Sequence, residues 1–174
     1  MTMPETLSSL SEGIRRCTAC PLWKKRLLAV PGEGPAPASL MFIGEAPGAE
    51  EDRQGLPFVG RSGKFLDEMF QIAEIQRKDV FITGSCKCHP PQNRTPTSLE
   101  LKTCKSLWLD KQIAIIRPKL IVLLGSVALF SVLGMKEVSK LHGKVIEQEN
   151  QKYFITYHPA AGMRFPKIRK LMKE

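Results

Sequence analysis

The chain has 174 residues, of which 43% are hydrophobic and 25% charged, and these proportions suit one globular domain, over 1–174, with its own core. Its 26 Lys and Arg against 17 Asp and Glu give a formal charge of +9, which favours nucleic acid over an anionic membrane surface because no Lys-rich amphipathic stretch stands out. The longest apolar run, 120–124, is too short to span a bilayer, and the N-terminus lacks the pattern of a secretory signal. We therefore expect a cytoplasmic protein without membrane association.

The first half of the chain predicts a helix followed by strands that end in long loops. Residues 4–28 are expected to be helical around a CxxC motif. Residues 40–43 form a short apolar run that stops at a Gly/Pro-rich turn, as a buried parallel strand does. The irregular stretch 45–60 has the length of a functional loop, the apolar spacing over 62–75 predicts a helix, and 79–83 predicts a second strand.

The second half continues the alternation of helices and strands. Thr97 and Glu100 form a capping pair that marks the start of a helix, which Pro118 ends. The most apolar strand follows, then a short helix, two weak strands and a basic helix: 119–124, 127–133, 144–147, 153–156 and 165–173. This order predicts a three-layer α/β/α fold with a mainly parallel sheet.

Four short motifs fall where the predicted strands end. They are GEAPG at 44–48, GSCKC at 84–88, Gly125–Ser126 and HPAA at 158–161. Ligands bind beyond the carboxyl ends of the strands in such folds. We therefore expect the four motifs to meet at one cleft.

Three residues in these segments are candidates for chemistry. Glu45 would present a carboxylate that can hold or activate water. Phe58 either stacks on a planar ligand or anchors its loop on the core. His158 is either a hydrogen-bonded structural histidine or a donor that stabilises negative charge on a leaving group.

Basic and polar residues near these motifs are candidates for phosphate contacts. Ser62 and Lys64 lie where a helix opens, and free amides there bind phosphate, although Ser62 can equally be an ordinary N-cap. Six further side chains are either phosphate contacts or solvated surface residues. These are Lys87, Arg94, Arg164, Lys167, Arg169 and Lys170.

Four of the five cysteines predict a metal centre. Cys17 and Cys20 form the CxxC motif, and Cys88 and Cys104 follow far downstream. Disulfides are not expected in the cytoplasm. Zinc and a [4Fe–4S] cluster both accept four thiolates, and the spacing does not choose between them. Cys86 is left over and is expected to pack inward at a strand end.

Taken together, these motifs resemble those of the iron–sulfur, family 4, uracil-DNA glycosylases. The similar segments are CTAC, PGEG, GEAPG, EEDRQGLPFVGRSGKFL, the KC-x-PPxNRTP pattern, KLIVLLG and HPAA, which span almost the whole chain. The resemblance implies a four-stranded parallel sheet between helices and a structural [4Fe–4S] cluster. The cluster ligands would be Cys17, Cys20, Cys88 and Cys104.

The resemblance also implies an activity and roles in it. A monomer would hydrolyse the N-glycosidic bond of uracil in double- or single-stranded DNA, leaving an abasic site for base excision repair, after the base has flipped out of the stack. The backbone of Gly44 and Ala46 would contact the base, Phe58 would stack on it, and His158 would donate to a uracil carbonyl. Glu45 occupies the first catalytic motif. In the DNA-probing segment, Met163 would be a wedge and Arg164 a DNA contact.

The chain departs from the family pattern at Gly84. The family usually has Asn there, which reads the Watson–Crick edge of uracil, and glycine offers no side-chain donor or acceptor. Two alternatives therefore stay open. One is a glycosylase for another deaminated base, such as hypoxanthine or xanthine, and the other is a non-catalytic binder of uracil-containing DNA.

Overall fold

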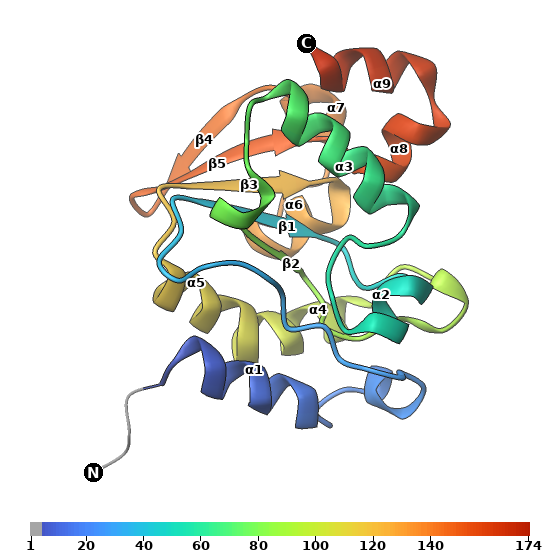
Figure 1. Ribbon diagram of the computed structural model, residues 1–174, viewed down its shortest axis with the longest axis vertical. Helices are drawn as coiled ribbons and strands as arrows, with labels where there is room; N and C mark the ends of the chain where they lie inside the picture. The colour runs from blue at the N-terminus through green and yellow to red at the C-terminus, as the bar shows by residue number, and fades with distance from the viewer. Residues whose placement is uncertain (1–4) are drawn as a thin grey trace.

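The computed structural model describes residues 5–174 and is built on one sheet (Figure 1). The strand order is β2-β1-β3-β5-β4, and every neighbouring pair is parallel except β4 with β5. The strands are β1 Leu40–Gly44, β2 Phe81–Gly84, β3 Leu120–Leu124, β4 Val145–Gln148 and β5 Gln151–Thr156.

The fifth strand corrects the four-stranded sheet that the resemblance implies. β4 lies at the edge and pairs antiparallel with β5. The two residues between these strands, Glu149 and Asn150, both have left-handed backbone, with φ of 51° and 62°. Two successive positive φ values are the geometry of a tight hairpin turn, which folds β4 back along β5.

Nine α-helices are present in residues 5–174. They are α1 Leu7–Arg16, α2 Ala49–Gln54, α3 Arg61–Ile72, α4 Ser98–Cys104, α5 Asp110–Ile116, α6 Ser126–Leu133, α7 Val138–Leu141, α8 Pro159–Arg164 and α9 Pro166–Lys173. The predicted capping pair is confirmed, because Thr97 Oγ1 accepts from the Glu100 N–H and the Glu100 carboxylate accepts from the Thr97 N–H. A π-helical turn, Lys105–Leu109, joins α4 to α5.

The prediction of one helix over 4–28 is wrong after α1, and residue 4 lies outside the described residues. α1 ends at Arg16, and Cys17 is extended, with ψ 134°. Cys20 is extended because it precedes Pro21, whose ring disfavours the helical conformation of the residue before it. The CxxC motif is therefore an irregular link between α1 and a short 3-10 helix, Pro21–Lys24.

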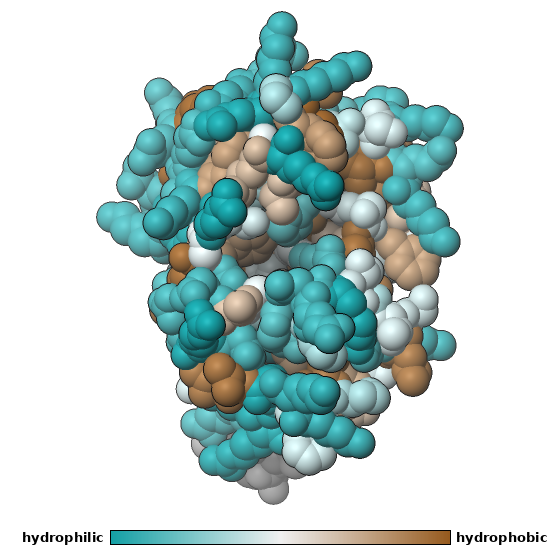
Figure 2. All heavy atoms as spheres, turned by 90° about the vertical axis from the view of Figure 1, so that its right-hand side faces the viewer, coloured by the Kyte–Doolittle hydropathy of each residue, from teal (hydrophilic) through white to brown (hydrophobic). Residues whose placement is uncertain are grey.

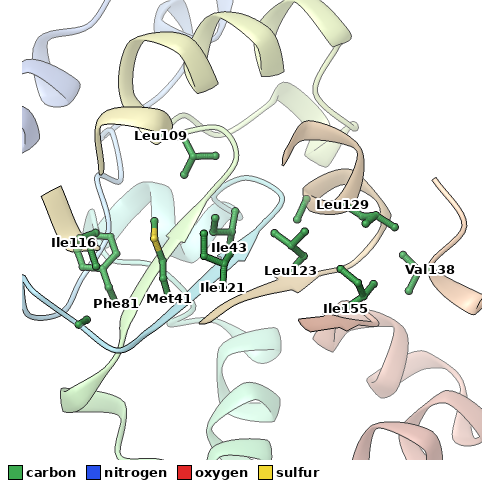
Figure 3. Packing of buried hydrophobic residues seen from close by; sticks show 12 residues of the cluster. Met41, Ile43, Phe81, Leu109, Ile116, Ile121, Leu123, Leu129, Val138 and Ile155 are labelled. Atoms are coloured by element: carbon green, nitrogen blue, oxygen red, sulfur yellow. The ribbon is translucent and has the colours of Figure 1, made fainter. Parts of the chain in front are cut away.

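Helices cover both faces of the sheet, which confirms the three-layer α/β/α prediction. Side chains alternate between the faces of a strand. On one face, Met41, Ile43, Ile121 and Leu123 pack with residues of α6 and α7 and with the π-helical turn before α5 (Figure 3). On the other face, Phe42, Ile82, Val122 and Leu124 pack against Leu66 and Phe70 of α3, and α8 and α9 extend the α3 layer.

No helix within residues 5–174 has the length and apolar character needed to cross a bilayer.

Candidate active site

The carboxyl ends of β1, β2 and β5 open into a cleft of about 400 Å³, a size typical of small-molecule sites. Figure 2 shows the face toward which these strands run, where hydrophilic side chains surround a central hollow. The cleft is lined by residues Val30, 45–51, Pro57, Phe58, 60–62, Thr83, Gly84, Asn93 and His158. Three of the four predicted motifs therefore meet, and the fourth stands behind them, since a Cβ on Gly125 would lie 2.8 Å from the His158 Cβ.

His158 is the N-cap of α8 at the edge of this cleft. Its Nδ1 accepts a hydrogen bond from the Ala160 backbone N–H at 3.1 Å, so the neutral imidazole carries its proton on Nε2. Withdrawal of the ring from water lowers the pKa of His158 to about 4, although the Glu51 carboxylate acts in the opposite direction. Near neutral pH the side chain is an uncharged donor through Nε2.

The ring of Phe58 lies beside His158, with 5.8 Å between the ring centres. The Phe58 backbone is left-handed, with φ 49°, which is uncommon for a bulky side chain. A Cβ on Gly44 would lie 2.7 Å from the Phe58 ring and 3.9 Å from His158 Nε2. A larger residue at position 44 would displace the ring, so glycine here lets the backbone at the end of β1 approach Phe58 and His158, both of which line the cleft.

Glu51 of α2 holds the loop that presents Phe58. Its carboxylate oxygen Oε1 accepts from the Val59 N–H at 2.9 Å and from the Gly60 N–H at 2.8 Å. These two amides follow Phe58 directly and precede α3. Sequence reasoning missed Glu51, because nothing in the acidic run 50–52 distinguishes the residue whose carboxylate faces a distant loop.

Glu45 follows β1 directly and lines the cleft, as predicted. Burial raises the pKa of its carboxyl group, because loss of water disfavours the charged form. Its backbone carbonyl accepts from the Cys86 N–H at 3.0 Å, which ties the loop after β1 to the loop after β2. Glu45 is thus placed where a carboxylate can accept a proton from water.

Gly84 ends β2 next to Gly44, its partner in the sheet. A Cβ at position 84 would lie 2.7 Å from the Cys86 carbonyl oxygen and 3.5 Å from the Ala46 Cα. The turn after β2 therefore closes on this position. An Asn here would require the backbone to move.

Comparison with known proteins shows which family this chain belongs to. The family model described as the uracil DNA glycosylase superfamily matches residues 31–174. This chain belongs to the uracil DNA glycosylase superfamily. It is 44% identical to a type-4 uracil-DNA glycosylase of Saccharolobus solfataricus and 43% identical to one of Sulfurisphaera tokodaii, covering 98% of this chain in both and 83% and 81% of the relatives. A type-5 uracil-DNA glycosylase of Pyrobaculum aerophilum is 30% identical over 84% of this chain and 71% of that protein.

This superfamily member also has a second, smaller cavity, which we call the cysteine cavity. It is lined by Cys17, Cys20, Cys88 and Cys104, together with Arg26, Lys87 and Trp108 and four other residues. Trp108 Nε1 donates to Cys17 Sγ at 3.2 Å, and Arg26 Nη1 donates to Cys88 Sγ at 3.1 Å. Thiols from two distant segments therefore meet, and N–H groups already point at their sulfurs.

Cys86 is buried and does not line the cysteine cavity. Its thiol is hydrogen-bonded to Cys104, which together with burial raises the pKa of Cys86. The pKa of Cys104 is lowered by this hydrogen bond and by the Lys87 ammonium and amide. Cys104 is thus the better thiolate of the two. Within residues 5–174, no three His, Cys, Asp or Glu side chains are grouped to hold a metal ion.

The residues that we expected to contact DNA in this superfamily member lie in several places. Ser62 lines the cleft in the first turn of α3, where Gly60 and not Ser62 is the N-cap, and Lys64 is exposed nearby. Met163 and Arg164 belong to α8, not to a loop, because His158 caps a helix there and Pro159 occupies its first position.

Several of the predicted phosphate contacts are otherwise engaged, and one of them is Arg169, whose guanidinium pairs with the Glu68 carboxylate at 3.2 Å. Arg94 binds the buried Glu100 carboxylate through both terminal nitrogens, at 2.8 and 2.9 Å, and does not line the cleft. The neighbouring Asn93, which sequence reasoning did not select, does line it. The prediction for Lys87 is wrong, because this side chain is 1% exposed and lies inside the fold.

Proposed function

We propose that this chain is a monofunctional uracil-DNA glycosylase, which hydrolyses the N-glycosidic bond of uracil in DNA and leaves an abasic site. The observation that carries the proposal is the uncharged Nε2 donor of His158 beside the Phe58 ring in the cleft. The type-4 and type-5 relatives named above carry the name uracil-DNA glycosylase. Among residues 5–174, no lysine lines the cleft as a Schiff-base nucleophile, so strand cleavage is not part of the proposed reaction.

The cleft residues divide the work of base removal. Phe58 stacks on the flipped base, and the backbone of Gly44 and Ala46 contacts its edge. As the bond between sugar C1′ and uracil N1 breaks, its electron pair leaves with the base. The His158 Nε2–H donates to the carbonyl oxygen on which this charge accumulates. Water then adds its oxygen to C1′ and gives its proton to Glu45.

The cysteine cavity fits an iron–sulfur cofactor by the chemistry of its donors. Four soft thiols converge from two segments, and two N–H groups already point at their sulfurs, which suits sulfur-rich cluster ligation. Ligands of a four-iron cluster surround the irons from outside, so they need not be grouped tightly enough for a single ion. We assign Cys17, Cys20, Cys88 and Cys104 to a [4Fe–4S] cluster that, when bound, ties the N-terminal segment to the sheet.

The proposed partner is DNA. We propose that the chain acts on it in the cytoplasm as a monomer, and that residues 1–174 form one domain. The free amides at the start of α3 suit a phosphate beside Ser62. Exposed basic side chains of α3, α8 and α9 would contact DNA phosphates and release their counterions. They are Lys64, Arg164, Lys167 and Lys170. Arg94 would join them only by giving up its pair with Glu100, and Met163 remains the candidate wedge.

A second substrate class is favoured by Gly84. No side chain at this position reads the base edge, and a cleft of about 400 Å³ does not exclude a purine. Hypoxanthine or xanthine in DNA is therefore the alternative substrate. The other alternative is a protein that binds uracil-containing DNA and has no catalytic activity.

A single-turnover assay on duplexes carrying uracil, hypoxanthine, xanthine or thymine at one position separates these functions. We expect excision of uracil and no release of thymine, with DNA binding measured on the same duplexes. Faster excision of a purine would move the assignment to the alternative substrate class. Tight binding of the uracil duplex with no excision of any base would make the protein a binder.

A further inference from the structure

Lys87 is a buried lysine that the proposed reaction does not use. Its side chain is 1% exposed, and its ammonium group donates to three neutral oxygens. These are Thr83 Oγ1 at 2.6 Å, the Gly84 carbonyl at 2.8 Å and Gln112 Oε1 at 2.6 Å. All three ammonium protons thus have acceptors, but none of the acceptors is a carboxylate.

The three acceptors belong to the floor of the cleft or support it. Thr83 and Gly84 line the cleft. The Thr83 hydroxyl and the Gln112 amide both donate to the Pro31 carbonyl, at 2.8 and 2.7 Å. The Lys87 carbonyl accepts from the N–H of Val30, another cleft residue, at 2.7 Å. Lys87 therefore holds two chain segments of the floor together.

The same lysine lines the cysteine cavity on its other side. Among the described residues, the ionisable groups that act on its charge are the thiols of Cys104, Cys86 and Cys88. A buried cation without an opposite charge is costly. A [4Fe–4S] core with four thiolates carries a net charge of about −2, and Arg26 and Lys87 are the two cations that line this cavity.

We propose that Lys87 is the positioning residue through which the iron–sulfur cluster organises the base-binding floor of the cleft. The thiolates of the loaded cluster neutralise the ammonium group on one side. On the other side the ammonium holds Thr83 and Gly84 at the end of β2, where the base edge lies. The inference rests on the proposed cofactor and on the proposed uracil substrate.

Two matched variants of the loaded protein test this role. Lys87→Met keeps the length of the side chain and removes its charge and donors. Arg26→Met removes the other cation, whose contacts are Cys88 Sγ, the Cys17 carbonyl and the Arg15 carbonyl and do not include the cleft. Iron per protein is measured first, and then affinity for a duplex with an uncleavable 2′-fluorodeoxyuridine, relative to the same duplex with thymine.

In protein with equal iron content, we expect Lys87→Met to lower the preference for the uridine analogue by about tenfold, since buried acceptors are left unmade. Arg26→Met should lower the iron content of the protein as purified, but at equal iron content it should keep this preference within about twofold. Binding of the thymine duplex should not change in either variant. An unchanged preference in fully loaded Lys87→Met would overturn the proposal.

Hydrogen exchange decides the question if Lys87→Met does not fold. Wild-type protein is compared before and after removal of its cluster. Exchange should rise at the amides of Val30, Ser85 and Cys86, and the centre of β3 should stay protected. Unchanged protection of those three amides would overturn the proposal. Absence of iron in the wild type would instead refute the cofactor, and absence of any preference for the analogue would refute the substrate, independently of Lys87.

Discussion

The cleft and the cysteine cavity lie on either side of residues 83–88. Burial favours the neutral forms of ionisable groups in both sites, and the sites differ in the charges that oppose this effect, which are the Glu51 carboxylate in the cleft and the Arg26 guanidinium in the cysteine cavity. In the cleft, burial raises the pKa of Glu45 and lowers that of His158, so both groups are driven toward their neutral forms. In the cysteine cavity, burial raises the pKa of Cys88 to about 11, although the Arg26 guanidinium opposes this.

This difference shows what each site needs to be complete. Protein groups alone set the state of His158 in the cleft: burial lowers its pKa, the Glu51 carboxylate opposes this, and the Ala160 amide fixes the tautomer. The cysteine cavity holds buried thiols and two cations, and it reaches charge balance when a metal centre makes the thiols thiolates. We therefore propose catalysis for the first site and cofactor binding for the second.

The largest effect is expected from Cys104→Ser, which breaks the cysteine cavity. Loss of one of four cluster ligands should remove nearly all iron and lower stability, because cofactor binding and folding are coupled. Cys86→Ser is the matched control, since Cys86 lies outside the cavity, and it should retain iron. Iron analysis of anaerobically purified proteins makes the comparison. Stoichiometric zinc without iron in the wild type would contradict the assignment.

His158→Ala should break the cleft while leaving the cysteine cavity intact. Loss of one donor to the leaving group is expected to lower the single-turnover rate by about 10²–10³-fold. Iron content should not change. His142→Gln serves as the control, since His142 bonds the Leu171 carbonyl away from the cleft, and its rate should stay at the wild-type level. An unaltered rate in His158→Ala would return His158 to a structural role.

The pH dependence of the rate sharpens the difference in charge. Glu45 must be ionised to accept a proton, and burial raises its pKa, so the rate should fall with decreasing pH at values above the ordinary Glu pKa of about 4.3. Glu45→Gln should be slow, and its rate should not show this fall at low pH.

The raised pKa of Glu45 also predicts an effect on stability. Because the neutral form is favoured in the folded state, the stability that Glu45 contributes is lost as pH rises through its raised pKa. Glu45→Gln should therefore be no less stable than wild type at pH 7 in denaturant unfolding.

Glu51 gives the smallest expected effect and separates positioning from charge. Glu51→Ala leaves the Val59 and Gly60 amides without their acceptor, so Phe58 should be held less well. We expect a KM for uracil-containing DNA raised by about tenfold with a smaller change in kcat. Glu51→Gln retains the accepting oxygen and should restore KM, but the pKa of His158 should fall further, as NMR titration would show. Equal KM values for all three proteins would remove Glu51 from the positioning of Phe58.

Much of the cleft was predictable because chain topology places strand ends together. The segments 44–48 and 158–161 follow parallel strands, so Glu45 and His158 had to approach one edge of the sheet. The capping pair of Thr97 and Glu100 was likewise predictable, because it depends only on residues three apart. Residue chemistry also singled out four cysteines, although Cys88 and Cys104 lie far from the CxxC motif in the sequence.

What only the tertiary structure decided are the partners of charged residues and the local geometry that packing imposes. The sequence predicts Lys87 as a phosphate contact. The structure instead places it between the two sites, where it donates to acceptors that lie 3, 4 and 25 residues away in the sequence. Glu51 finds its amides across a loop, and Gly84 closes on Cys86. Sequence period and residue type determine which face a side chain takes, because they reflect local backbone geometry. Long-range packing then determines whether a charge meets solvent, an opposite charge or a buried oxygen.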